Sequence, residues 1–72
     1  MLINIKHKQM KLETRRIETL IANQQRSYKE VATAANVTER TLKAARSGQE
    51  IQPATAGRIA AALGVDVETI IK

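Results

Sequence analysis

Apolar residues recur at helical spacing from about residue 9 onward. One face of a helix would carry the apolar residues Met10, Ile17, Leu20 and Ile21. Charged residues alternate with them on the other face, which predicts a first helix from about Gln9 to about Asn23. Residues 1–8 alternate only weakly between apolar and polar positions, so they predict an N-terminal arm that is either a short strand or unstructured. The remaining residues, 9–72, form the predicted domain.

The segment 27–48 has the pattern of two short helices joined by a tight turn. Ser27 is a good N-cap, and a glutamate three residues later completes a capping box. Asn36 tolerates the left-handed conformation that a turn between helices requires. The predicted helices run over about 28–35 and about 39–46. Each has a narrow apolar side, formed by Val31, Ala32 and Ala35 in the first and by Leu42 and Ala45 in the second.

The last third of the chain predicts a loop, a helix and a short final turn. The loop covers Gln49–Gln52, and the helix covers about Ala54–Leu63, because Pro53 suits a helix start. Asp66 is placed to cap the final turn. Every predicted element of the domain is therefore helical, and the fold class is all-α with five helices.

Composition supports a small helical domain. The chain has 72 residues, neither Phe nor Trp, and one aromatic residue, Tyr28. A core built from Ile, Leu, Val and Ala favours thin helices that approach each other closely. A domain of this size buries only about 60% of the surface of its unfolded chain, so its stability should be marginal.

The formal net charge is +5, and much of the excess is near the N-terminus. A polyanionic partner fits this charge, although many basic proteins bind no polyanion. The arm itself has two interpretations. Its lysines, Lys6 and Lys8, can follow a phosphate backbone together with Lys11. Alternatively, an apolar trio can pair with a partner strand or cover the core, namely Leu2, Ile3 and Ile5.

Several functional classes lack the residues they need. The chain has no cysteine, and its single histidine, His7, has no neighbour in sequence that suggests a metal site. Without a nucleophile–base constellation or a glycine-rich phosphate loop, we expect no catalysis, metal or cofactor. No apolar run approaches the roughly 20 residues of a membrane span, and no secretory signal is recognisable, so we expect a cytoplasmic protein.

Ordered motifs along the chain resemble the helix-turn-helix domain of the lambda-repressor/Cro family. The resemblance covers about residues 17–71. It rests on Ile17-x-x-Leu20, Ser27-x-x-x-Val31-Ala32, Asn36-Val37-Thr38-x-x-Thr41-Leu42, Gly48, Pro53 and Ala62-Leu63-Gly64-Val65. It implies a five-helix DNA-binding domain whose third helix enters the major groove.

The resemblance also implies roles for individual residues. The base-reading positions of that family fall on Glu39, Arg40 and Ala44. The positions that contact phosphate or groove edges fall on Tyr28, Thr38, Thr41, Lys43 and Arg46. Of these, Arg40 has the planar fork that binds guanine through two hydrogen bonds, and Ala44 offers only apolar contact.

Simpler interpretations of the same residues remain open. Glu39 also suits the positive end of a helix dipole, and Thr38 suits a plain N-cap. The three cations of the predicted helix 39–46 also fit a solvated face. The family's usual ion pair between the first and third helices is absent at its usual positions, where this chain has Ile21 and Arg46, so we expect Arg46 to be free for a phosphate or an acidic partner.

Taken together, these features predict a transcriptional regulator, similar to a phage or mobile-element repressor or Cro protein. It would bind double-stranded DNA as a homodimer at a two-fold site. Candidate dimer contacts are Ile51, Val67, Ile70 and Ile71, which also fit core positions. The alternative function is a modulator or antirepressor that binds another repressor protein in place of DNA.

Overall fold

The computed structural model of the chain describes residues 10–72, so the predicted arm at residues 1–8 lies outside the described residues. Within this range the protein is mostly helical, which confirms the coarse prediction. The elements in chain order are β1 (Met10–Lys11), α1 (Thr14–Gln24), α2 (Tyr28–Ala35), α3 (Glu39–Arg46), β2 (Glu50–Ile51), α4 (Pro53–Leu63) and α5 (Val67–Ile70).

Helices α2 and α3 have the bounds predicted from the sequence. The Ser27 hydroxyl accepts a hydrogen bond from the backbone N–H of Glu30, and the Glu30 carboxylate accepts one from the backbone N–H of Ser27, which completes the capping box. Asn36 ends α2 in the left-handed conformation with φ of 62°. The chain therefore reverses between the two helices within a few residues, as the pattern predicted.

A short antiparallel ribbon corrects two sequence predictions. Met10 pairs with Ile51 and Lys11 with Glu50, so the predicted loop after α3 contains a strand. Residues 10–12 are extended, and α1 begins at Thr14, not near Gln9. Leu12 forms a further antiparallel bridge with Ile71, which ties the start of the described chain to its end.

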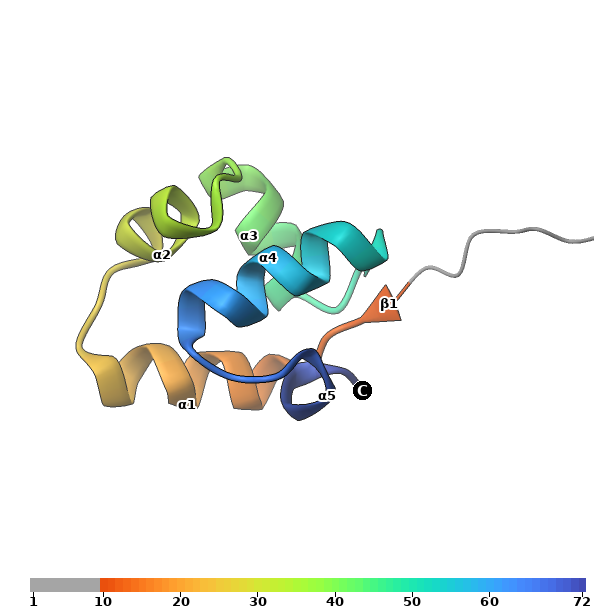
Figure 1. Ribbon diagram of the computed structural model, residues 1–72, viewed down its shortest axis with the longest axis horizontal. Coiled ribbons are helices and arrows are strands. Elements are labelled where there is room, and N and C mark those ends of the chain that lie inside the picture. Colours follow the sequence, from red (N-terminus) through yellow and green to blue (C-terminus); the bar gives the residue numbers. More distant parts are fainter. Residues whose placement is uncertain (1–9) are drawn as a thin grey trace, which may run out of the picture.

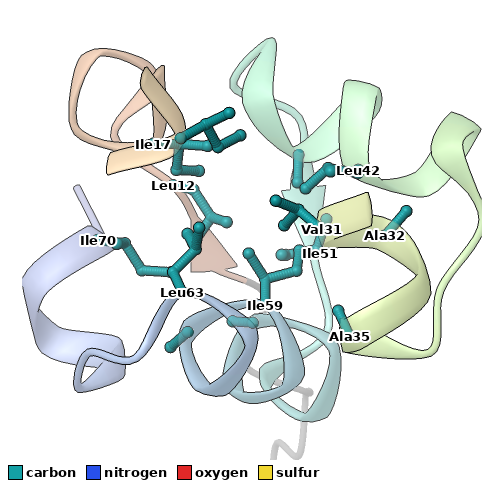
Figure 2. Close-up of a cluster of buried hydrophobic side chains, with 14 residues drawn as sticks. Leu12, Ile17, Val31, Ala32, Ala35, Leu42, Ile51, Ile59, Leu63 and Ile70 are labelled. Atoms are coloured by element: carbon teal, nitrogen blue, oxygen red, sulfur yellow. The ribbon is translucent and has the colours of Figure 1, made fainter. Parts of the chain in front are cut away.

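Helix α4 lies across the middle of the molecule in the view of Figure 1, with α2 and α3 on one side and α1 and α5 on the other. All five helices send aliphatic side chains into one core (Figure 2). The largest fully buried side chains are Leu12, Ile17, Leu42, Ile59, Ile70 and Val31. Each aliphatic side chain buried in this way stabilises the fold by about 1.5–3 kcal/mol.

Side chains from the end of α1 and from the α1–α2 connection donate hydrogen bonds to the last carbonyls of α4. The Gln24 amide donates to the Leu63 carbonyl at 2.8 Å, and the Arg26 guanidinium donates to the Ala62 carbonyl at 2.7 Å. A cation at this position also complements the negative end of the α4 dipole. Gln25 between them adopts the left-handed conformation with φ of 54°. This connection therefore holds α1 against the end of α4.

The remaining sequence predictions on α4 and α5 need small corrections. Helix α4 starts at Pro53, one residue earlier than predicted. Asp66 occupies the N-cap of α5, but its side chain makes no capping hydrogen bond. Gly57 is exposed, and a Cβ built on it would meet no atom within 4 Å. Its lack of a side chain therefore serves no close contact within the described chain.

Candidate nucleic-acid interface

Helix α3 is held by a narrow apolar side and exposes most of its remaining surface. Leu42 and Ala45 are fully buried, with no solvent-accessible area. Glu39, Arg40 and Lys43 are exposed, and each lies on α3 away from the core. Because few residues of α3 face the core, its cationic side chains Arg40 and Lys43 face solvent.

The predicted base-reading residues differ in how much surface they offer. Glu39 and Arg40 lie in the first turn of α3 and are exposed, whereas Ala44 is half-buried one turn further along. Glu39 is also the acidic residue at the positive end of the helix dipole, the position that its simpler interpretation requires. Arg40 is therefore the base-reading candidate with both an exposed side chain and hydrogen-bond donors to offer.

The two threonines at the start of α3 bond to each other. The Thr38 hydroxyl accepts a hydrogen bond from the backbone N–H of Thr41 at 3.1 Å, which makes Thr38 the N-cap of α3. It also donates to the Thr41 hydroxyl at 3.0 Å. This pairing fixes the first turn of α3 and uses the hydroxyl proton of Thr38, whereas the Thr41 hydroxyl only accepts in it.

Arg46 is engaged in an ion pair, which corrects the prediction that it is free. Its Nη1 donates to the Glu18 carboxylate at 2.7 Å, and both side chains are partly exposed. The pair joins α1, which carries Glu18, to α3, which carries Arg46. The sequence prediction missed this pair because it considered only Ile21 as the partner on α1, and Glu18 lies one turn earlier. The hydrogen bond to Glu18 raises the pKa of Arg46 above its ordinary value.

Tyr28 lies under the same arginine. The Arg46 Cζ is 5.1 Å from the centroid of the Tyr28 ring, a cation–π distance. Burial raises the pKa of the Tyr28 hydroxyl, and the Arg46 charge opposes this shift. The structure thus brings together two predicted phosphate contacts, Tyr28 and Arg46, and adds Glu18, which sequence reasoning missed.

The candidate dimer residues divide into two groups. Ile51 and Ile70 are 7% and 0% exposed and belong to the core, the second of the two interpretations that the sequence left open. Val67 and Ile71 are partly buried against the core and keep some exposed surface. Ile71 also lines a surface groove of about 660 Å³ between α1 and α5, whose other lining residues include Leu20 and carry charges of both signs.

Other kinds of site find no support in residues 10–72. No group of three or more His, Cys, Asp or Glu side chains in this range is arranged to hold a metal ion. None of the helices described in it is long and apolar enough to cross a membrane.

Comparisons with known proteins add no further information about this surface. No protein-family model, no curated protein and no solved structure matches the chain.

Proposed function

We propose that this protein is a sequence-specific DNA-binding transcriptional regulator that places α3 in the major groove. The observation that carries the proposal is the exposed face of α3, where Arg40 and Lys43 face solvent on a helix fixed by α2 through a tight left-handed turn. A helix of this width fits the major groove, and its first turns meet the base edges. The resemblance to the lambda-repressor/Cro family supports the same docking.

In this proposal the residues of α3 have distinct tasks. Arg40 contacts a base edge, and its fork matches the two acceptors of guanine. Lys43 and Lys29, both exposed, contact phosphates on either side of the groove. Two-fold DNA sites match a homodimer, so we further propose that two copies bind together, with Val67 and Ile71 as the remaining candidates for their contact.

The test is a selection of duplexes from a random-sequence pool by the purified chain, followed by titration at two salt concentrations. We expect one sequence family to be enriched and to bind more tightly than a scrambled duplex. Affinity for both should fall with salt, by about 0.9 in log K for each unit of log salt per neutralised phosphate. If the selection enriches no sequence family, or if an enriched duplex binds no more tightly than its scrambled control, the proposal is wrong.

A second candidate function is a modulator that binds another repressor protein. The observation that favours it is the limited hydrogen-bonding capacity of α3, where Glu39 suits the helix dipole and Ala44 is half-buried. The groove between α1 and α5 offers this partner Leu20 and Ile71 on its lining. Failure to enrich DNA, combined with salt-resistant binding to a co-expressed repressor, would favour this function.

A further inference from the structure

Helix α1 holds the last turn of α3 at two points. The Thr14 hydroxyl donates a hydrogen bond to the backbone carbonyl of Arg46, and the Glu18 carboxylate accepts one from the Arg46 side chain. Thr14 and Glu18 are four residues apart on α1, so both lie on the same face of that helix. One face of α1 therefore binds both the backbone and the side chain at the same residue of α3.

Helix α2 adds a third contact to the same residue. The Tyr28 ring, in the first turn of α2, lies 5.1 Å from the Arg46 Cζ. The Arg46 Nε is buried and has no hydrogen-bond partner among residues 10–72, so the inner edge of the guanidinium faces protein and not solvent. Arg46 thereby connects α1, α2 and α3 through three different kinds of contact.

These contacts matter because the connection to α2 and the Thr38 cap fix only the first turn of α3, so its last turn needs contacts of its own. It has eight residues, a length of roughly 12 Å at 1.5 Å per residue, and it buries only Leu42 and Ala45. Such a narrow apolar side allows the helix to tilt or rotate on the core. A fixed last turn restricts both movements, and it thereby sets where Arg40 at the other end of the helix points.

We propose that Arg46 is a positioning residue for α3, held by Thr14, Glu18 and Tyr28, and that it does not bind DNA phosphate. The inference rests on the proposed function, because positioning matters for DNA only if α3 reads bases. It assigns Thr14 and Glu18, which lie outside α3, an indirect role in specificity. It also removes one of the predicted phosphate contacts.

The first test is Glu18→Gln, measured on the duplex enriched by the wild-type chain and on a scrambled duplex. Removing a carboxylate makes the protein more cationic, so affinity for the scrambled duplex should rise. If α3 loses its position, the ratio of specific to non-specific affinity should fall about tenfold, the cost of one lost base contact. Glu68→Gln is the matched control, since it changes the charge equally on α5. An equal rise on both duplexes for both variants would overturn the proposal.

The second test exchanges the charges of the pair. Arg46→Glu and Glu18→Arg should each lower the specificity ratio, whereas the double variant restores an ion pair of opposite polarity at unchanged net charge. We expect the double variant to recover specificity above either single variant. If Arg46 binds phosphate, Arg46→Glu will instead weaken binding to both duplexes with little change in their ratio, the double variant will recover no specificity, and the proposal is then wrong.

A third measurement separates this proposal from the proposed function. The backbone N–H groups of Ser47 and Gly48 donate to the Lys43 and Ala45 carbonyls in the last turn of α3. Thr14→Val should accelerate hydrogen exchange at these amides, and Thr14→Ser, which keeps the hydroxyl, should not. If the wild-type chain enriches no DNA but this exchange pattern is found, the proposed function fails while the contact between α1 and α3 stands. Unchanged exchange in Thr14→Val overturns the positioning role.

Discussion

Arg40 is the residue on which base recognition depends in the proposed function. It is exposed in the first turn of α3, and its guanidinium has no hydrogen bond to another residue of the described chain. Arg40→Ala should weaken binding to the enriched duplex by about 1–3 kcal/mol and relax the preference at one base pair. Arg58→Ala on α4 removes the same charge from another exposed helix and serves as the control. Equal losses from both variants would show that only net charge matters.

Tyr28 gives a second prediction at the residue scale, since it is the one aromatic residue of the chain. Burial disfavours the tyrosinate and raises its pKa. A group with a raised pKa in the folded state holds its proton to higher pH than the unfolded chain, so its contribution to stability is complete below about pH 10 and is lost as the pH rises through the folded pKa. The tyrosinate absorbance should therefore appear at higher pH in buffer than in urea. Coincident titration curves would contradict the burial of Tyr28.

Single residues also show what sequence reasoning can and cannot predict about the site. The caps at Ser27 and Thr38 were predictable because their partners are three residues away. The ion pair between Glu18 and Arg46 spans 28 positions, and no local pattern encodes such a distance. The resemblance led to the expectation that Arg46 is free, because the compared position of the first helix holds Ile21, whereas the actual partner, Glu18, lies one turn earlier on α1.

At the scale of elements, predictability follows the range of the interactions. Helices α2 and α3 have capping residues and a turn residue at both ends, and their bounds were correct. Met10 fits a helical face with Ile17 and Leu20 as well as an extended segment, so the sequence alone misplaced the start of α1. What decides between the two is the pairing of β1 with β2 and of Leu12 with Ile71. These partners lie far along the chain, where local periodicity gives no information.

The left-handed residue at the end of α1 has a conformational free-energy cost that can be measured. Gln25 adopts the left-handed conformation, which disfavours residues with a Cβ by about 1–2 kcal/mol, while glycine loses about 0.5–1 kcal/mol more conformational entropy on folding. Gln25→Gly should therefore stabilise the fold by roughly 0.5–1 kcal/mol in urea denaturation. Gln49→Gly, at an exposed position with an ordinary φ, should destabilise it. If both substitutions destabilise, the conformation of Gln25 is not strained.

At the scale of the whole molecule, the core limits how much change the protein tolerates. Within the described range, residues 10–72, fourteen buried apolar residues form a single cluster, and five of them are alanines. Ile59 is fully buried on α4, between α2 and the ribbon (Figure 2). Ile59→Ala should cost about 2–5 kcal/mol, a large part of the 5–15 kcal/mol typical of a folded domain. Thermal unfolding followed by circular dichroism measures this cost, and Ala61→Gly at an exposed position of the same helix should cost only about 1 kcal/mol.

Assembly of two copies is also a property of the whole molecule. Because Ile51 and Ile70 are buried, Val67 and Ile71 remain as candidates for the contact between the copies. If two copies meet there, Val67→Lys places a charge in their contact and separates them. Since Val67 also packs against the core, circular dichroism is used to check that the variant is folded. Binding to a duplex with two half-sites should then fall sharply, because the gain from linking two binding events is lost, while binding to one half-site is retained. Ala61→Lys on α4 adds the same charge at an exposed position and controls for it. Sedimentation velocity on both variants tests this contact. If the copies meet through Val67, only Val67→Lys lowers the sedimentation coefficient. An unchanged coefficient would place the contact elsewhere on the molecule.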